Sequence, residues 1–392
     1  MTAAVKQHLI DPELCIRCYT CEEICPIDAI THDDENVVVD ASICDCCMDC
    51  ILPCPTGSID NWRVVKAPYS MADQYGWMEL PEQEEFASES VEAIDESIVT
   101  LLAEAHAGAG GRSIAPASAS KPAVNVFPLS HPVNATVQGN FRLTEQGADA
   151  DIRHIILSLG DEVFPVLEGQ SVGITPPGLA ANGKPHMPRL YSISSPRDGE
   201  RPNTNNLSLT VKRGEHGVCS NFICDLEKGA AVQLSGPFGS TFLMPDDPQA
   251  KLIMICTGTG SAPFRAFTMR HQRVMPAING SLHLFFGART ANSLPYFGPL
   301  KKVPQEFLTK HFALSRDAET PKQYVQDRLR AELETIAPML SEPTTHVYLC
   351  GLKAMEAGVE EAFTEIATAA GLNWTEIRDK MRETGRYHVE TY

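Results

Sequence analysis

Hydrophobic positions divide the chain into stretches with different periods. Past residue 130, short apolar runs alternate with turn residues, a pattern typical of antiparallel β structure that forms a barrel. These runs are Ile155–Leu159, Ser171–Ile174, Leu207–Val211 and Ala231–Leu234. From Lys251 the order becomes strand, Gly-rich turn and helix, with further strands at Leu282–Gly287 and His346–Cys350. This order predicts a doubly wound α/β domain.

The middle of the chain combines helical periodicity with a stretch of small residues. Apolar residues recur at helical spacing at Val91, Ile94, Ile98, Leu101, Leu102 and Ala105. Residues 103–123 are rich in Ala, Gly, Ser and Pro, which is the composition of a flexible linker. A coil of about 20 residues spans roughly 25 Å on average. We therefore expect the linker to tether the preceding part and leave it free to move.

The length of 392 residues suits two or three domains. We expect a multidomain α+β protein, divided into a cysteine-rich domain (1–66), an acidic helix with a linker (67–128), an antiparallel β-barrel (129–246) and a doubly wound α/β domain (247–392). No run approaches eighteen uninterrupted apolar residues, and residues 1–14 lack the apolar core of a signal peptide. These features predict a cytoplasmic protein that does not enter a membrane.

The charge lies at one end of the chain. Residues 1–110 contain 22 Asp and Glu against 4 Lys and Arg, whereas the two kinds balance over residues 111–392. The net charge of −18 therefore belongs to the first quarter of the sequence. Such a field repels nucleic acid and anionic membranes and favours a protein partner with a basic patch. A solvated face that only keeps the protein soluble is the alternative.

Nine of the thirteen cysteines lie between residues 15 and 54, a density that indicates metal rather than disulfides in a chain without a secretion signal. They include two runs of equal spacing, Cys15-x2-Cys18-x2-Cys21-x3-Cys25-Pro26 and Cys44-x2-Cys47-x2-Cys50-x3-Cys54-Pro55. In this bacterial ferredoxin pattern the fourth Cys of each run ligates the other cluster. One [4Fe-4S] cluster would take Cys15, Cys18, Cys21 and Cys54, and the other Cys44, Cys47, Cys50 and Cys25.

Structural zinc also uses Cys-x2-Cys pairs, but it gives no reason to repeat the fourth Cys with its Pro. The run 25–30 is echoed by the run 54–59, which supports two matching halves. Cys46 lies outside the pattern, and we expect it to be a spare buried thiol. The N-terminal part thus resembles a bacterial two-cluster [4Fe-4S] ferredoxin.

The Gly-rich turn at residues 257–260 is a weak signal alone, because many turns before a helix bind nothing. The turn becomes informative together with the other motifs of residues 130–392, because this series of motifs resembles plant-type ferredoxin–NADP⁺ reductases. The motifs are Arg189-Leu190-Tyr191-Ser192, Val211-Lys212-Arg213, Gly217-Val218-Cys219-Ser220-Asn221-Phe222, Gly258-Thr259-Gly260-x-Ala262-Pro263-Phe264-Arg265, Ser315-Arg316, Lys322-x-Tyr324-x-Gln326, Cys350-Gly351-Leu352 and His388-Val389-Glu390-Thr391-Tyr392.

This resemblance implies an FAD cofactor and NADPH as substrate. It places Arg189 on the flavin pyrophosphate, Tyr191 against the isoalloxazine and Ser220 on the phosphates. The other residues implied to bind FAD are Ser192, Lys212, Gly217 and Cys219. Those implied to bind NADPH are Gly258, Thr259, Gly260, Ser315, Arg316, Lys322, Tyr324 and Gln326. Arg, Lys and hydroxyl donors suit a 2′-phosphate, whereas Asp or Glu grips a ribose 2′-hydroxyl.

The resemblance also implies a hydride-transfer site made of Ser192, Cys350, Glu390 and Tyr392, with Tyr392 stacked on the flavin where the nicotinamide must go. Two departures from the family stand out. Only residues 214–216 intervene where plant-type enzymes carry a longer segment with a Tyr for the adenine ring, so the adenine end of FAD is expected to be held loosely or in another pose. Cys256 replaces a usual Gly, with little expected consequence.

NADPH gives two electrons as hydride and an iron–sulfur cluster accepts one, so a flavin belongs between them. The predicted order is NADPH, FAD, first cluster, second cluster and an external protein. The order of parts and the runs at residues 9–18 and 60–63 resemble the reductase components of benzoyl-CoA 2,3-epoxidase systems. This implies a di-iron epoxidase as acceptor in aerobic benzoate degradation. A reductase fusion that serves another oxygenase or a ferredoxin pool, and a redox sensor that transfers nothing, remain alternatives.

Overall fold

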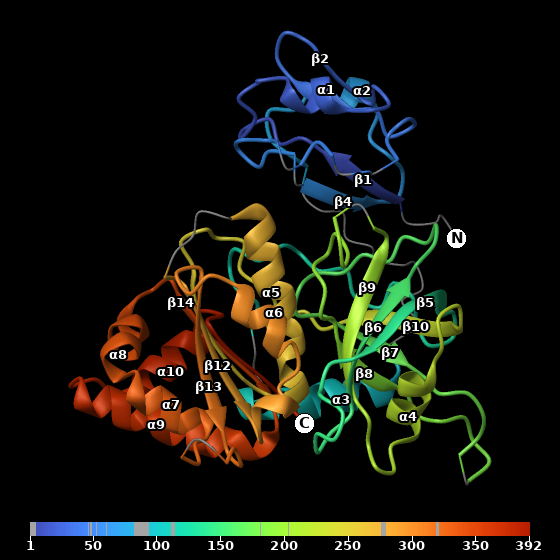
Figure 1. The fold of residues 1–392 in the computed structure, drawn as a ribbon. Coiled ribbons are helices and arrows are strands. Elements are labelled where there is room, and N and C mark those ends of the chain that lie inside the picture. The colour runs from blue at the N-terminus through green and yellow to red at the C-terminus, as the bar shows by residue number, and fades with distance from the viewer. Residues whose placement is uncertain are drawn as a thin grey trace. The chain divides into compact units, whose positions relative to one another are not determined.

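The computed structural model describes residues 5–45, 47, 49–51, 53–59, 61–81, 94–110, 114–180, 182–202, 204–275, 280–318 and 321–392. The chain forms two compact units (Figure 1). Unit 1 comprises Met1–Val91, Leu159–Pro165 and Asp198–Asn206, and unit 2 comprises Glu92–Ser158, Val166–Arg197 and Leu207–Tyr392. None of the helices in the described ranges has the length and apolar character needed to cross a membrane.

Unit 1 contains short strand pairs, short helices and the cysteine loops. Its elements are β1 (Val5–Leu9), paired antiparallel with β4 (Asn61–Val65), β2 (Ile30–His32), paired antiparallel with β3 (Val37–Val39), α1 (Thr20–Ile24) and α2 (Met71–Tyr75). Its small core joins Ile10, Ile30 and Ile59 to the buried side chains of Cys21 and Cys50. Because cysteines fill part of this core, the chemistry of the thiols and the packing of unit 1 are linked.

The first layer of unit 2 is a six-stranded antiparallel sheet in the order β8-β7-β10-β5-β6-β9. The strands are β5 (Val133–Arg142), β6 (Ile152–Ser158), β7 (Ser171–Ile174), β8 (Arg189–Ser192), β9 (Asn206–Lys212) and β10 (Ala231–Phe238). Just past β8 the chain meets β9 at the bridge between Ile193 and Leu209, and Ser194 N–H donates to Ser208 O at 2.8 Å. The two outer strands of the sheet therefore meet, as the expectation of a barrel requires. Helix α4 (Val218–Asp225) follows β9.

The second layer is a parallel sheet in the order β13-β12-β11-β14-β15, which confirms the doubly wound prediction. The strands are β11 (Lys251–Thr257), β12 (Leu282–Ala288), β13 (Leu308–Leu314), β14 (Thr345–Gly351) and β15 (Tyr387–Thr391). Along β11, Ile253 and Ile255 enter one core while Leu252 and Met254 enter another, because successive side chains of a strand point to opposite faces. The strand order reverses between β11 and β14, and such a point is where ligands bind in α/β folds.

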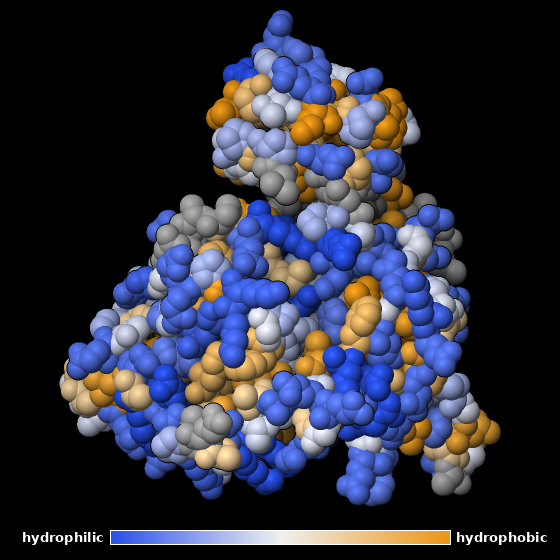
Figure 2. Space-filling model, viewed as in Figure 1, coloured by the Kyte–Doolittle hydropathy of each residue, from blue (hydrophilic) through white to orange (hydrophobic). Residues whose placement is uncertain are grey.

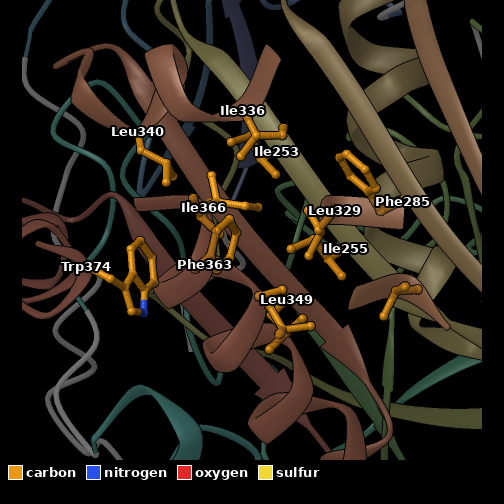
Figure 3. Packing of buried hydrophobic residues seen from close by; sticks show 14 of the residues in the cluster. Ile253, Ile255, Phe285, Leu329, Ile336, Leu340, Leu349, Phe363, Ile366 and Trp374 are labelled. Atoms are coloured by element: carbon orange, nitrogen blue, oxygen red, sulfur yellow. The ribbon is translucent and has the colours of Figure 1, made fainter. Parts of the chain in front are cut away.

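Helices cover both faces of this sheet (Figure 1). They are α5 (Ser261–Val274), α6 (Phe297–Lys302), α7 (Val325–Ala331), α8 (Leu333–Ser341), α9 (Glu356–Ala369) and α10 (Trp374–Glu383), with single 3-10 turns η2 (Gly258–Gly260), η3 (Ala291–Ser293) and η4 (Lys353–Met355). Figure 3 shows Ile255 and Leu349 of the sheet packed with Phe363 and Trp374 of α9 and α10. Complete burial of such side chains contributes about 1.5–3 kcal/mol each, so this core holds the carboxyl ends of the strands in place.

The expected flexible linker is bound to unit 2 along its described residues. Helix α3 (Glu96–Ala105) begins after Asp95, whose carboxylate accepts from Ser97 N–H, and η1 (Ala107–Ala109) follows. Val91, where the sequence placed the start of the helical pattern, lies outside the described residues. His106 and Ser120 hydrogen-bond to Val389 and Asp246 respectively, so the expectation of a free tether is wrong for these residues.

Candidate functional site

Four cysteines of unit 1 line one small cavity. They are Cys25, Cys44, Cys47 and Cys50. Three belong to the second cysteine run and one to the first, which is the exchanged set that the spacing predicted for one cluster. His8 and Asp45 complete the polar part of the lining.

The other predicted ligands also approach one another. Cys54 lies near enough to Cys18 and Cys21 to interact with both thiols electrostatically, and Cys15 interacts with Cys21 in the same way. Hydrogen bonding to Thr20 nevertheless lowers the pKa of Cys18 overall. In the loop that carries them, Arg17 and Tyr19 have φ angles of 54° and 60°. Left-handed conformations cost non-glycine residues on the order of 1–3 kcal/mol each and cluster at functional sites.

The thiols of unit 1 suit a cluster. All twelve described cysteines are free of disulfides, and Cys46 lies outside the described residues. Burial raises the pKa of Cys21 to about 11 and that of Cys50 to about 12, so these sulfurs become ligands only when a cation stabilises the thiolate. Over the described part of the chain, no group of three or more His, Cys, Asp or Glu could hold a metal ion. A cubane spreads its four thiolates around itself instead of gathering them on one ion.

The predicted flavin residues lie along β8 and at the start of α4. Arg189 is exposed, whereas Tyr191 and Ser192 are half-buried. The Tyr191 hydroxyl donates to the Cys219 thiol of α4, and burial raises the pKa of Tyr191 above its usual range. Tyr191 lies on an outer strand of the sheet, and Cys219 holds its hydroxyl. Its ring can therefore offer a face for stacking a flavin.

The amino end of α4 is built for close approach. Ser220 Oγ accepts from Gly214 N–H at 3.0 Å and donates to Gly217 O at 3.2 Å. A Cβ at Gly217 would overlap this hydroxyl, so a larger residue there would displace Ser220 Oγ. The unsatisfied N–H groups at a helix amino end favour phosphate, which fits the pyrophosphate of FAD.

A second cavity, of about 600 Å³, opens at the carboxyl ends of the parallel strands. Its size falls within the range of small-molecule and cofactor sites. Its lining includes six of the eight residues predicted to bind NADPH, namely Gly258, Ser315, Arg316, Lys322, Tyr324 and Gln326. Thr259 and Gly260 do not line it; a Cβ at Gly260 would overlap the carbonyl oxygen of Cys350, so this turn packs on β14.

Three charged residues of this cavity were not predicted to line it. Lys212 was expected with the flavin but lines this cavity, and Arg289 at the end of β12 lines it as well. Arg289 belongs to no motif, and its only signal was its place after a strand of the α/β domain. Asp149, also missed, lies 3.1 Å from Arg289 and 3.9 Å from Arg316. With Lys322, the cavity lining thus contains four cations and one carboxylate, an excess of positive charge that favours a phosphate ligand.

The residues predicted for hydride transfer meet where the two layers of unit 2 join. Cys350 and Glu390 are register partners on β14 and β15, and Ser171 and Ser192 are partners on β7 and β8. The Ser171 hydroxyl hydrogen-bonds to the Glu390 carboxylate and so links the pairs.

Glu390 and Tyr392 have the properties that a redox site needs. Glu390 is 9% exposed, and burial raises its pKa to about 7, although the Ser171 hydrogen bond opposes this shift. Its Oε2 has no hydrogen-bond partner among the described residues. Tyr392 is 59% exposed, and its hydroxyl lies 2.5 Å from Thr259 Oγ1. A carboxyl that titrates near neutral pH thus lies beside an exposed aromatic ring.

The antiparallel barrel offers an aromatic ring and a helix amino end that suit a flavin, and the doubly wound domain has a cationic cavity that suits a 2′-phosphate. Together they define an NADP-dependent flavoprotein oxidoreductase. Comparisons with known proteins agree. Residues 254–361 match the oxidoreductase NAD-binding domain family, and residues 8–31 match the 4Fe-4S binding domain family. Ferredoxin–NADP reductase of Spirulina sp is 36% identical over 288 residues, which cover 69% of this chain and 98% of that protein. The cyanelle enzyme of Cyanophora paradoxa is 40% identical over 69% of this chain and 79% of its own length.

Among solved structures, ferredoxin–NADP⁺ reductase from Plasmodium falciparum aligns with a TM-score of 0.55 at 24% identity, over 69% of this chain and 99% of that chain. This likeness shows the fold. The sequence identities show the family: the chain belongs to the ferredoxin–NADP reductase family and carries an N-terminal 4Fe-4S motif.

Proposed function

We propose that the protein oxidises NADPH through FAD and passes the electrons singly, through two [4Fe-4S] clusters, to a separate protein. One observation carries the proposal: Glu390, Cys350 and Tyr392 gather beside a cationic cavity at the switch point of the α/β sheet. The same chain holds a cavity lined by four cysteines. The first arrangement suits nicotinamide oxidation and the second suits electron export.

Each residue of the reductase site has a role in this proposal. Arg316 and Lys322 would hold the 2′-phosphate, and the exposed Tyr392 ring would cover the flavin position that the nicotinamide needs. When bound, FAD would supply the chemistry that joins two-electron hydride transfer to one-electron export. Conversion of NADPH to NADP⁺ with export of two electrons leaves one proton. Glu390, whose pKa of about 7 leaves it partly ionised at neutral pH, accepts that proton at Oε2.

The acceptor docks on the cysteine-bearing face of unit 1. Cys18 is exposed, and its neighbours Leu14 and Ile16 are 50% and 63% exposed. Hydrophobic and hydrophilic residues are interspersed on the visible face of this unit, the blue segment of Figure 1 (Figure 2). Because residues 1–110 carry the whole net charge of −18, the matching partner presents Lys and Arg around an apolar contact.

The acceptor we propose is the di-iron epoxidase of a cytoplasmic benzoyl-CoA degradation system. Support comes from the order of the domains and from the runs at residues 9–18 and 60–63. A general NADPH–ferredoxin reductase fusion is the second candidate, since the 4Fe-4S motif and the reductase fold in one chain suit it equally.

Anaerobic addition of NADPH to the purified protein tests the electron path. We expect bleaching of the flavin band, then reduction of the clusters seen by electron paramagnetic resonance, and steady turnover with ferricyanide. Bleaching without turnover would indicate a sensor and contradict the proposal. The Cys25→Ser variant should keep ferricyanide turnover but lose one cluster signal. Reduction of a purified benzoyl-CoA epoxidase, compared with a bacterial ferredoxin, then decides between the two acceptors.

A further inference from the structure

The strand that carries Glu390 and Tyr392 lies at an edge of its sheet. β15 pairs with β14 on one side only, so its other side needs cover. Helix α3 and the turn η1 pack against β15 and supply that cover. Figure 1 shows α3 beside the C-terminal end of the chain. The cover comes from residues that precede the barrel in sequence, which connect it to the cysteine-rich part.

This segment is attached to β15 and its surroundings at three points. At the start of β15, Arg382 donates to Gly108 O at 3.1 Å while its guanidinium lies 5.3 Å from the centre of the Tyr387 ring. At the middle, His106 Nδ1 donates to Val389 O at 3.1 Å. Since Val389 precedes Glu390, this bond fixes the backbone of the carboxyl that titrates near neutral pH.

The third attachment reaches the penultimate residue. Thr391 Oγ1 donates to Glu356 Oε1 at the start of α9. The backbone of Gly108 packs on the same carboxylate, because a Cβ on Gly108 would lie 2.5 Å from Glu356 Oε2. A side chain at position 108 would therefore displace the Glu356 carboxylate, which accepts from Thr391. Tyr392 follows directly, and its own N–H donates to Gly351 O at 2.9 Å, so the Thr391 contact is one of two successive attachments of the tail.

We propose that residues 95–110 are a brace that positions Glu390 and Tyr392, so that the connection to the cysteine-rich part is itself a component of the hydride site. His106 and Gly108 are its positioning residues. The inference rests on the proposed function in that Tyr392 is taken to occupy the nicotinamide position. A looser brace makes Tyr392 easier to displace. This change favours NADH most, because NADH lacks the 2′-phosphate that anchors NADPH in the cavity.

The test uses His106→Ala and Gly108→Ala in the full-length holoprotein. His131→Ala, at an exposed histidine, and Gly298→Ala, where an added Cβ meets nothing within 4 Å, are the matched controls. With ferricyanide as acceptor, we expect the NADH-to-NADPH ratio of kcat/KM to rise about 2- to 10-fold in both brace variants, the effect of losing one hydrogen bond. The controls should keep the wild-type ratio.

Two further measurements separate the brace from a general loss of stability. In a Tyr392→Ser background the brace variants should no longer change the ratio, because residues that act through the same group are not additive. Hydrogen exchange of residues 387–392 should be faster in the brace variants than in the controls.

The proposal is overturned if hydrogen exchange of residues 387–392 is unchanged in both brace variants. It is also overturned if the brace variants keep the wild-type NADH-to-NADPH ratio while Tyr392→Ser changes that ratio. An effect that persists in full without Tyr392 also overturns it. If Tyr392→Ser alone has no effect on the ratio, the tail does not occupy the nicotinamide position and the proposed function fails at that point. The exchange data then decide the brace by themselves.

Discussion

Replacement of Arg316 by alanine should weaken NADPH binding selectively. The Arg316 side chain lines the nucleotide cavity and is 64% exposed, with Asp149 at 3.9 Å as its counter-ion. A hydrogen bond between charged groups contributes about 1.5–3 kcal/mol, and exposure to solvent favours the lower half of that range. We expect the Kd for NADPH to rise roughly 10- to 30-fold, with NADH kinetics almost unchanged.

Replacement of Asp149 by asparagine should have the opposite effect and strengthen NADPH binding. The carboxylate lies 3.1 Å from Arg289, so a bound 2′-phosphate would share its cations with a like charge. At about 7 Å in water, a dianion and a carboxylate repel by about 1 kcal/mol before screening, and by about half of that at physiological salt. NADPH should therefore bind roughly 2- to 3-fold more tightly to Asp149→Asn.

The assay is ferricyanide reduction with NADPH and with NADH, together with inhibition by 2′,5′-ADP, which carries the 2′-phosphate without a nicotinamide. Arg201→Ala is the matched control, because Arg201 is exposed and does not line the cavity. The inhibitor should lose as much affinity for Arg316→Ala as NADPH does. A wild type that prefers NADH, or an equal loss for both nucleotides, would refute this account of the cavity.

Three further outcomes are expected. The holoprotein should contain about eight iron and eight sulfide per chain, unchanged in Cys46→Ser, and stoichiometric zinc instead of iron would contradict the cluster assignment. Burial raises the pKa of Glu390 to about 7, so a carboxylate that accepts a proton should make ferricyanide turnover rise with pH through about 7; an inflection that survives in Glu390→Gln would exclude this role. Reduction of the partner protein, but not of ferricyanide, should slow as the Debye length falls from about 30 Å at 0.01 M salt to about 8 Å at 0.15 M. Charge reversal at five acidic positions should slow partner reduction in the same way at low salt; these positions are Glu22, Glu23, Asp33, Asp34 and Glu35. A rate of partner reduction that changes with neither salt nor charge reversal would mean that the acidic surface serves solubility only.

The sequence predicted best what depends on local pattern. The run Ser171–Ile174 coincides with β7, and the run from Lys251 coincides with β11 to within one residue, because buried strands are short and continuous in apolar residues. Contacts that depend on sheet register could not be predicted from the sequence. Nothing local in the sequence pairs Cys350 with Glu390, or sets Ser171 against Glu390, since parallel strands join residues far apart in the chain. Motif resemblance supplied the members of the site, and the structure supplies their hydrogen bonds.

The linker shows why composition misjudged one segment. Ala, Gly and Ser bury little side-chain surface, so residues 103–123 gave no signal of packing. Glycine, however, lets the backbone itself approach a neighbour, as Gly108 does at Glu356, and Gly385 lets α10 end against the carbonyl oxygen of Ala115. A division of the chain at residue 128 would separate α3 from β15, whereas the compact units divide at residue 91. The segment that composition marks as a spacer is therefore bound to the strand that ends in Tyr392.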